Sequence, residues 1–394
     1  MKYVYGIIGA GRQGTAAAYD LCVNGEAAEV WLGDAQIEQS GAAADRVNRL
    51  LNQDRVRPVH VDVRDEASIL PFLQRVKVLI SAVPYYLNLN LAEKAVRAGV
   101  SMCDLGGNTE IVFRELELDA IAKMNGCTLV PDCGMVPGLG TSVCMYAMSL
   151  VEEPEEVYLW DGGLPQNPKH PWNYIMTFHF EGLVNEYCGT TEFLRDGKII
   201  EMPCFQEYET ISFPEPIGEL EAFTTAGGTS TAPRTFHGRL KVYQNKTLRY
   251  KGHFDQWKAF HDAGLLAEEP VSVKGTSIRP RDLLSAVLNP KIAAQPGEKD
   301  VCIIRALCKG TNRGRQVTAL VDLYDWFDDK TGFTAMERTT GWHAAIVAGM
   351  MARREITPGA IPVELAIPGK FMVDACRARG MKVLDSIKRL DLPV

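Results

Sequence analysis

Three glycines near the amino terminus have the spacing that lets a backbone hold a pyrophosphate. Gly9, Gly11 and Gly14 follow the pattern G-x-G-x-x-G, between an apolar run (YVYGII) and an alanine-rich run that favours a helix. Gly9 would turn the chain, Gly11 would admit the anion, and Gly14 would let the helix pack on the strand. Asp34 ends the next apolar run, at the spacing where a carboxylate accepts hydrogen bonds from an adenosine ribose. These residues predict a dinucleotide site.

Asp34 also bears on which dinucleotide is bound. A 2′-phosphate would meet its negative charge, and the following segment, AQIEQS, contains no arginine to neutralise that phosphate. The sequence therefore predicts NAD as the cofactor. The alternative for Asp34 is a purely structural cap or turn at the end of its strand.

The alternation of strand and helix continues up to about residue 134. The runs RPVHVDV, VKVLISAVP, VSMCDLGG and CTLVPDCG are strand-like, and each precedes a helical stretch. This pattern predicts an α/β fold with a Rossmann-type, doubly wound parallel sheet, in which ligands bind beyond the carboxyl ends of the strands. The predicted cofactor contacts are Gly9, Gly11, Arg12, Gln13, Gly14, Asp34, Ser81, Ala82, Val83, Pro84, Asp104 and Gly106.

The remainder of the chain has a different pattern, in which strands alternate with tight turns. Two helical stretches, FDQWKAFHDAGLL and PRDLLSAVLNP, interrupt the strands, and Asp196-Gly197 is a typical two-residue hairpin turn. We expect an α+β domain, 135–340, with a largely antiparallel sheet that supplies the substrate pocket and a dimer surface. The last helical runs resemble cover for the first sheet, so the NAD-binding domain is predicted to be discontinuous, 1–134 and 341–394.

A glycine pair among hydroxyls stands out in this second part. The loop GGTST contains Gly227, Gly228, Thr229, Ser230 and Thr231. Glycine allows a close backbone approach or a positive φ, and the hydroxyls can donate or accept hydrogen bonds, so the loop can hold a small polar group. A Gly-Gly hairpin turn is an equal alternative.

Two arginines of the second part, Arg234 and Arg249, are candidates for binding a substrate carboxylate, which arginine does with two hydrogen bonds. For either one, a solvated position on a strand is the alternative.

Composition excludes several classes of protein. The chain has 394 residues and a formal charge of −7, without the basic stripe that nucleic-acid binding needs. The amino terminus has no export signal, and no apolar run has membrane-spanning length. The ten cysteines show neither C-x-x-C pairs nor zinc spacing, so we expect reduced thiols, no metal site and a cytoplasmic protein.

Longer motifs resemble the saccharopine dehydrogenase family over essentially the whole chain. After the glycine fingerprint come DLGG, PDCGMVPG, DGGLP, FEGL, LEAFTTAGGTSTAPRTF, LRYKGH and IPGK, in the family's order. DGGLP and LRYKGH also look like saccharopine reductases. The GGTST loop followed by Arg234 is more similar to lysine 6-dehydrogenases within the family.

This resemblance implies oxidation of an amine carbon with hydride transfer to NAD. For L-lysine, the ε-carbon would lose hydride, ammonia would leave after hydrolysis of the imine, and the aldehyde would cyclise on its own α-amine. The Gly227-Gly228 loop and its hydroxyls, with Arg234 or Arg249, would hold the amino-acid head group, and Asp104 would lie near the substrate. A homodimer or higher homo-oligomer is expected.

The resemblance does not identify one catalytic base. Asp132 is the first candidate for proton transfer because it ends a strand near the expected cofactor, and Asp104, Tyr174 and His179 are alternatives. His179 departs from the family pattern, where a small polar residue is expected. Asp132 as a loop or helix-cap carboxylate is the structural alternative.

Two other functions remain open from the sequence. A saccharopine reductase, or another opine-like or carboxyalkyl-amine dehydrogenase, would share the fold but would need an additional basic cluster for a second carboxylate. A catalytically silent NAD-binding protein would keep the glycine fingerprint, and the polar residues of its second domain would be incidental.

Overall fold

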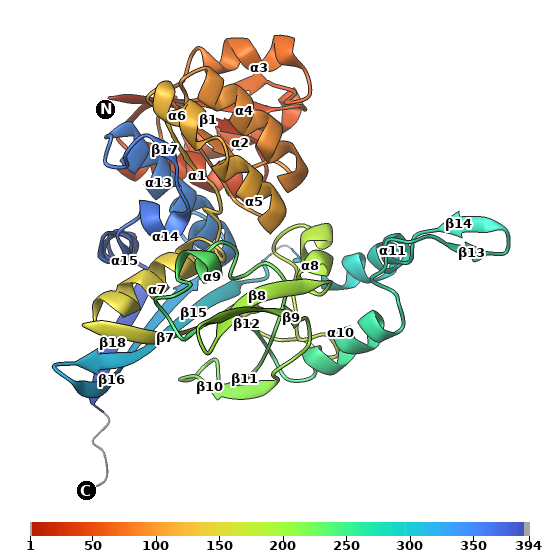
Figure 1. The fold of residues 1–394 in the computed structure, drawn as a ribbon. Helices are drawn as coiled ribbons and strands as arrows, with labels where there is room; N and C mark the ends of the chain where they lie inside the picture. Colours follow the sequence, from red (N-terminus) through yellow and green to blue (C-terminus); the bar gives the residue numbers. More distant parts are fainter. Residues whose placement is uncertain (1, 296, 390–394) are drawn as a thin grey trace, which may run out of the picture.

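The structure is a computed structural model that describes residues 2–295 and 297–389, and it consists of two sheet-based domains (Figure 1). In the nucleotide domain all strands run parallel, in the order β17-β6-β5-β4-β1-β2-β3. The strands are β1 (Tyr3–Ile8), β2 (Ala27–Asp34), β3 (Val56–His60), β4 (Val78–Ser81), β5 (Ser101–Asp104), β6 (Thr128–Val130) and β17 (Gly359–Ala360). This topology confirms the predicted doubly wound fold.

Helices cover both faces of this parallel sheet. They are α1 (Arg12–Asn24), α2 (Ile37–Leu51), α3 (Glu66–Leu73), η1 (Tyr85–Leu87), α4 (Asn88–Arg97), α5 (Thr109–Leu116), α6 (Asp119–Met124) and α13 (His343–Ala352). Helices α1, α2 and α13 share one apolar core, whereas α3, α4 and α6 contribute to a second core on the opposite face. Both faces of the strands are therefore buried, which explains their nearly continuous apolar sequences.

The second domain is built on a nine-stranded sheet in which only β12 and β7 pair in parallel. Its strands are β7 (Glu153–Pro165), β8 (Thr190–Arg195), β9 (Lys198–Pro203), β10 (Glu209–Ser212), β11 (Glu219–Phe223), β12 (Val242–Arg249), β15 (Asp300–Asn312), β16 (Arg315–Trp326) and β18 (Lys382–Arg389). The predicted α+β domain with a largely antiparallel sheet is thus confirmed. The β8–β9 turn has positive φ at Asp196 and Gly197, as the hairpin motif predicts.

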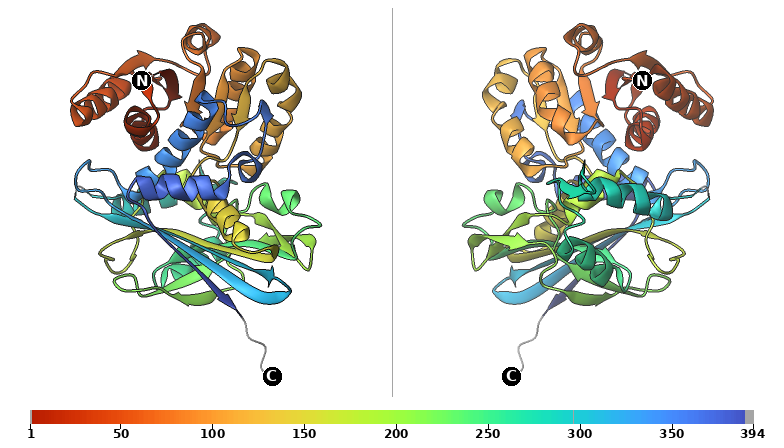
Figure 2. Two further views of the ribbon diagram at one scale, coloured as in Figure 1. Left: turned by 90° about the vertical axis from the view of Figure 1, so that its left-hand side faces the viewer. Right: turned by 90° about the vertical axis from the view of Figure 1, so that its right-hand side faces the viewer.

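The second domain also contains helices, some of which lie next to the nucleotide domain. They are α7 (Leu139–Ser149), α8 (Phe180–Glu186), α9 (Ala232–Thr235), α10 (His253–Asp262), α11 (Pro280–Ile292), α12 (Ala335–Glu337), η2 (Arg338–Trp342, a π-helix), α14 (Val363–Ala366) and α15 (Gly369–Ala378). Helices α7, α14 and α15 lie between the two sheets (Figures 1 and 2). The hairpin of β13 (Val271–Val273) and β14 (Thr276–Ile278) extends from α11 away from both domains (Figure 1).

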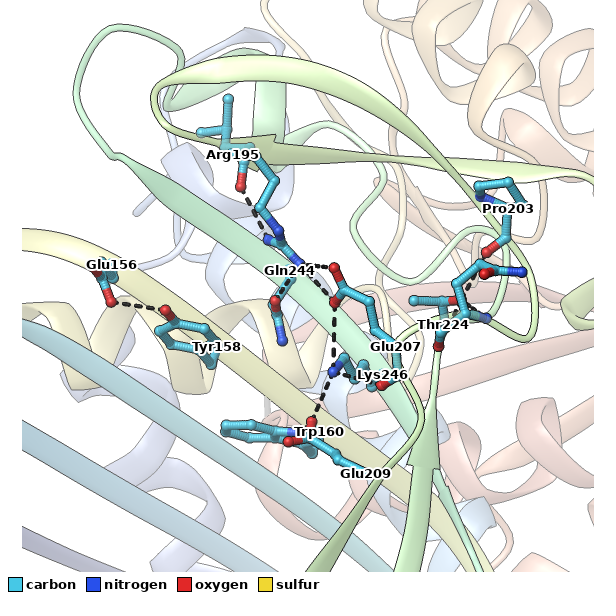
Figure 3. A network of polar contacts seen from close by, with 12 residues as sticks. Glu156, Tyr158, Trp160, Arg195, Pro203, Glu207, Glu209, Thr224, Gln244 and Lys246 are labelled. Atoms are coloured by element: carbon cyan, nitrogen blue, oxygen red, sulfur yellow. Dashed lines mark hydrogen bonds and ion pairs between the residues drawn. The ribbon is translucent and has the colours of Figure 1, made fainter. Parts of the chain in front are cut away.

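The two faces of the second sheet have different neighbours. Side chains alternate along β7, so Leu159 faces α7 and the nucleotide domain, on what we call the inner face, whereas Trp160 faces the opposite, outer side. On the outer face, Lys246 of β12 contacts Glu207 and Glu209 (Figure 3). Arg195 also forms an ion pair with Glu207 on this side. The cationic groups of Lys246 and Arg195 therefore lie on the outer face.

The carboxyl-terminal segment serves both domains. Helix α13 packs on β4 and β5, and β17 pairs with β6, as expected for a chain that returns to the nucleotide domain. Strand β18 instead pairs antiparallel with β16, from Tyr324↔Lys382 to Val317↔Arg389. The predicted assignment of 341–394 to the nucleotide domain does not fit β18, because this strand satisfies the backbone groups along β16 in the second sheet.

Neither a disulfide nor a membrane-spanning helix occurs in the described part of the chain. All ten cysteines are free thiols, and only Cys188 is partly exposed. None of the described helices combines the length and the apolarity needed to cross a membrane. Within residues 2–295 and 297–389, no group of His, Cys, Asp and Glu side chains is arranged to hold a metal ion.

The packing of η2 on the first helix yields a stability prediction. A Cβ added at Gly341 would lie 2.6 Å from the carbonyl oxygen of Gln13 and 3.0 Å from the Cβ of Ala16. We expect Gly341→Ala to lower the free energy of unfolding by about 1–3 kcal/mol, measured by denaturant titration. The control is Gly41→Ala in α2, where no atom lies within 4 Å and the change is expected to be neutral or stabilising. Equal effects of the two substitutions would contradict this account of the packing.

Candidate functional site

The glycine loop has the close contacts that the fingerprint demands. Gly9 has a φ of +103°, and a Cβ there would lie 2.3 Å from the carbonyl oxygen of Ala82. A Cβ on Gly14 would lie 1.9 Å from the carbonyl oxygen of Gly9, whereas Gly11 has no atom within 4 Å of its Cβ position. Two glycines therefore pack strand, loop and helix together, and Gly11 leaves open space at the start of α1. This arrangement fits a pyrophosphate at the helix amino terminus.

A cavity of about 400 Å³ adjoins this loop. Its lining includes the predicted residues Gly9, Gly11, Asp34, Ala82, Val83 and Pro84. The carboxylate of Asp34 accepts hydrogen bonds from the backbone N–H groups of Ala10 and Gln36, both at 2.9 Å, which fixes it at the cavity wall. Ser81, in contrast, is buried and donates its hydroxyl proton to Asn88 at 2.7 Å. The cavity has the position of an adenosine site, and Ser81 stabilises the loop behind it.

The same cavity contains an arginine that sequence reasoning missed. Arg64 lines the cavity and donates two hydrogen bonds to the carboxylate of Asp62, at 2.9 and 2.7 Å. This contact with Arg64 lowers the pKa of Asp62 to about 2. The prediction of NAD considered only the segment after Asp34, whereas the fold brings Arg64 in from the end of β3. The motif VDVRDE after that strand was the available signal.

Two buried carboxyl groups lie at the carboxyl ends of β5 and β6. The Oδ1 atom of Asp104 accepts hydrogen bonds from the N–H groups of Gly106, at 2.7 Å, and Asp132, at 3.3 Å. Asp132 has a φ of +62°, and its Oδ2 atom accepts a hydrogen bond from the hydroxyl of Ser230 in the second domain. The predicted base therefore lies where the two domains meet, next to the GGTST loop.

Burial changes the acidity of both groups. It raises the pKa of Asp104 to about 6. For Asp132, burial and then the charge of Asp104 raise the pKa to about 8, although the hydrogen bond from Ser230 favours the ionised form. A carboxyl group that titrates near pH 8 can accept a proton under mildly alkaline conditions and hold it at lower pH.

Glu115 is a third buried carboxyl group of this cluster, and sequence reasoning missed it. Its side chain on α5 is fully buried, and neither carboxyl oxygen has a hydrogen-bond partner among the described residues. Burial, followed by the charges of Asp104 and Asp132, raises the pKa of Glu115 to about 10. The available signal was its position three residues after the buried Val112, which places both on the inward side of the helix.

The residues of the GGTST loop form different contacts. Gly227 has a φ of +86°, whereas Gly228 allows a close approach, because a Cβ there would lie 1.9 Å from Oδ1 of Asn245. The hydroxyl of Thr229 donates to the carbonyl of Glu192, and that of Thr231 donates to the carboxylate of Glu364. Ser230 alone points its hydroxyl at Asp132. The two threonines anchor the loop, and Ser230 connects it to the carboxyl cluster.

A polar patch interrupts the apolar inner face of the second sheet. We define the inner-face patch as Asp161 of β7 with Asn245, Thr247 and Arg249 of β12, which share a face by alternation. Asn245 donates a hydrogen bond to Asp161 at 2.7 Å. The patch begins next to Gly228, so it adjoins the GGTST loop.

Arg249 is held by groups of the protein itself. It donates hydrogen bonds to the hydroxyl of Tyr187 and to the carbonyl of Leu248, and its guanidinium pairs with the carboxylate of Glu186 at 3.0 Å. Its guanidinium also lies 5.5 Å from the ring centre of Tyr174. Arg249 is thus buried in a polar network and already has an anionic partner.

The remaining predicted residues lie in three different surroundings. Arg234 is half-exposed, pairs with Glu192 at 2.7 Å and covers the ring of Phe113, so it lies outside the inner-face patch. Tyr174 is buried beside His253, and burial raises the pKa of its hydroxyl well above its usual value. His179 is exposed at the residue before α8. Of the alternatives to Asp132, only Asp104 lies in direct contact with it.

Arg12 forms a further contact between the domains. Its guanidinium, at the start of α1, donates a hydrogen bond to the carbonyl of Thr177 at 3.3 Å. Gln13 follows it in the helix, and its side-chain oxygen is buried without a partner among the described residues. The start of α1, directly after the cofactor loop, is therefore hydrogen-bonded to the second domain.

Comparison with known proteins assigns both domains. Residues 5–130 match the model of the saccharopine dehydrogenase NADP binding domain, and residues 134–376 match that of the saccharopine dehydrogenase C-terminal domain. The chain belongs to the saccharopine dehydrogenase family. Its members are dehydrogenases that act on CH–NH groups of amino-acid-related compounds, so the chain is an oxidoreductase with a nicotinamide-nucleotide domain, as the motifs indicated.

The individual relatives are distant but extensive. A carboxynorspermidine synthase of Vibrio cholerae serotype O1 is 23% identical, over 93% of this chain and 92% of that protein. A saccharopine dehydrogenase (NADP⁺, L-glutamate-forming) of Pyricularia oryzae is 22% identical, over 69% of this chain and 62% of its own length. The apo structure of saccharopine dehydrogenase (L-Glu forming) from Saccharomyces cerevisiae has a TM-score of 0.79 at 17% identity, covers 98% of this chain and all of its own, and shares the fold.

The raised pKa of Asp132 has a measurable consequence for stability. Above about pH 4 an unfolded chain releases this proton, whereas the folded protein retains it up to about pH 8. The folded state then binds more protons than the unfolded state. As the pH rises through this window, the free energy of unfolding of the wild type should therefore fall, relative to that of Asp132→Asn, by up to about 1.4 kcal/mol per pH unit. Denaturant titrations of both proteins across the window measure the difference. A difference that is independent of pH would contradict the assignment.

Proposed function

We propose that the protein catalyses NAD-dependent oxidative deamination of the ε-amine of L-lysine, with release of ammonia and cyclisation of the resulting aldehyde. The observation that supports this most is Asp132, a buried carboxyl group at the edge of the nucleotide domain that contacts the GGTST loop of the second domain. In this position Asp132 would serve as a proton acceptor between the expected sites of nicotinamide and substrate. The family's chemistry at CH–NH groups agrees with this role.

The chemistry begins with deprotonation of the substrate ammonium. The ionised Asp132 would take one proton from the nitrogen, which leaves a lone pair to form the C=N bond as hydride departs from the ε-carbon. The bound nicotinamide nucleotide supplies the hydride acceptor. Water then adds to the imine carbon and ammonia leaves. The hydrogen bond from Ser230 orients Asp132 and favours its ionised form.

The charges of the inner-face patch and its neighbours support the proposal of an amine-rich substrate. Asp161 and Glu186 contribute two carboxylates against the single guanidinium of Arg249. A substrate with additional carboxylates would need further cations, and Arg234 and Lys246 are paired elsewhere. This balance supports lysine over saccharopine, because lysine has two amines and one carboxylate.

A carboxylated polyamine is the second candidate substrate. It is favoured by the extent of the match to the carboxynorspermidine synthase, which covers more than nine-tenths of both chains. Such a compound also carries more amines than carboxylates, so it fits the same charge balance. Its secondary amine would be oxidised instead of a primary amine.

A panel of amines distinguishes these functions. Reduction of NAD is followed by absorbance with L-lysine, L-ornithine, saccharopine and a carboxylated polyamine as substrates, and ammonia is assayed in parallel. We expect turnover of lysine with one ammonia per NADH, and a loss of about a hundredfold or more in kcat for Asp132→Asn. Faster turnover of saccharopine or of the polyamine, without ammonia release, would assign the alternative function.

The pH profile follows from two groups that must lose protons. A free ε-ammonium has a pKa of about 10.4, and the pKa of Asp132 is raised to about 8, so both reactive forms increase with pH. We expect kcat/KM for lysine still to rise above about pH 8. A flat profile from about pH 6 to about pH 9 would contradict deprotonation by Asp132.

For the cofactor we propose NAD, since the carboxylate of Asp34 faces the adenosine cavity. Because Arg64 already lines this cavity, Asp34→Ser alone should strengthen NADPH binding about tenfold, equivalent to about 1.4 kcal/mol. Fluorescence titrations with NADH and NADPH measure both affinities. Asp45→Ser, an exposed position in α2, removes the same charge elsewhere and should change neither. A wild type that prefers NADPH would overturn the proposal.

A further inference from the structure

Asp161 is the one charged side chain of the inner-face patch that forms no ion pair within the described protein. Its Oδ1 atom accepts the hydrogen bond from Asn245, whereas its Oδ2 atom has no hydrogen-bond partner among the described residues. The side chain is partly exposed on the face that is directed towards the nucleotide domain. A carboxylate oxygen is therefore available at the junction of the domains.

The nearby cations are already paired with other carboxylates. Arg249 forms an ion pair with Glu186, and Arg234 forms one with Glu192. Lys246 follows Asn245 in β12 but points to the outer face, where it contacts Glu209 (Figure 3). None of these cations forms an ion pair with Asp161, so a cationic ligand group would be its best complement.

Asn245 holds Asp161 in a fixed orientation. Its side-chain oxygen lies so close to Gly228 that a Cβ there would be 1.9 Å away, and its amide group donates to Asp161. Asn245 is itself buried. The amide is thus wedged between the loop and the carboxylate, and it aims the free oxygen of Asp161 without neutralising its charge.

The GGTST loop spaces Asp161 from the proposed base. At one point of the loop, Gly228 contacts Asn245 and through it Asp161, and two residues later Ser230 contacts Asp132. Two residues of chain span at most about 7 Å, and the side chains and contacts at either end add a few ångströms each, so the two carboxylates lie at most roughly 20 Å apart. A five-carbon diamine whose two nitrogens each approach one carboxylate needs a separation that falls within this limit.

From this arrangement we propose that Asp161 binds the ammonium group of the substrate that is remote from the oxidised amine, and that it selects substrates with two amines. The inference rests on the proposed function and adds the determinant of substrate class. For lysine, the remote group is the α-ammonium. A monoamine of the same length lacks this contact, and Asp161 would be left without its cationic partner.

The protonation state of Asp161 is consistent with this role. Burial raises its pKa to about 6, and the hydrogen bond from Asn245 and the charge of Arg249 oppose that rise. The carboxylate is therefore ionised at the alkaline pH at which amine oxidation is expected to be fast.

Three substrates test the proposal by turnover. L-Lysine and 1,5-diaminopentane have two amines, whereas 6-aminohexanoate has the same reacting amine but no second one. We expect the wild type to prefer both diamines to 6-aminohexanoate by roughly tenfold to a hundredfold in kcat/KM. Asp161→Asn should abolish this preference, mainly through KM. Asp196→Asn, an exposed charge in the β8–β9 turn, should retain it. Equal losses for all three substrates in Asp161→Asn would overturn the proposal.

A binding measurement keeps the test independent of turnover. Calorimetric titration of 1,5-diaminopentane into the protein with NADH bound should show a dissociation constant at least about tenfold higher for Asp161→Asn than for the wild type and Asp196→Asn. Equal constants in the three proteins would overturn the role of Asp161. Failure of the proposed function is a different result, namely no reduction of NAD with lysine, or faster reduction with saccharopine or a carboxylated polyamine.

Discussion

The hydroxyl of Ser230 crosses from the second domain to the carboxyl group of Asp132, and the arrangement of the site depends on this contact. It joins the segment after β6 to the GGTST loop, although the two segments are far apart in the sequence. Thr231 of the same loop donates a hydrogen bond to the carboxylate of Glu364, which lies in α14, far along the chain. The loop is thus held by two acidic side chains, and its Gly228 packs against Asn245 of the inner-face patch.

The surroundings of Asp132 combine features that would destabilise an ordinary protein core. Asp104, Glu115 and Asp132 are all buried, and no arginine or lysine forms an ion pair with any of them among the described residues. Burial of carboxyl groups favours their neutral forms, and each charge raises the pKa of its neighbours. A cluster of this kind is costly for folding but useful for transferring protons, because its members titrate in different pH ranges.

Much of the fold could be predicted from local pattern. The alternation of apolar runs with helical runs predicted the parallel sheet, and the glycine spacing predicted the tight loop that contains Gly9 and Gly14. Strand β18 could not be assigned in this way, because its partner β16 is distant in the sequence and either sheet offered a possible edge. Pairing between distant strands depends on the whole domain and leaves little trace in a short segment.

Site residues could be predicted only where their type and their position in the sequence indicate a role. Asp34 ends a strand, Asp132 follows one closely, and the GGTST loop has an unusual composition, so the sequence alone could nominate these residues. Arg64 and Glu115 were missed because their importance comes from the cavity and the cluster into which the fold brings them. Arginines attract attention as anion binders, but the sequence does not show that Arg249 and Arg234 already have carboxylate partners.

In the proposed reaction, hydride leaves the carbon that bears the distal amine of lysine. L-Lysine with deuterium at both positions of its ε-carbon tests this directly, when the reduced nucleotide formed by the wild type is analysed by mass spectrometry. The account predicts one deuterium in each molecule of reduced nucleotide, and none when the label is at the α-carbon instead. Deuterium transferred from the α-carbon, or reduced nucleotide without label from the ε-deuterated substrate, would contradict it.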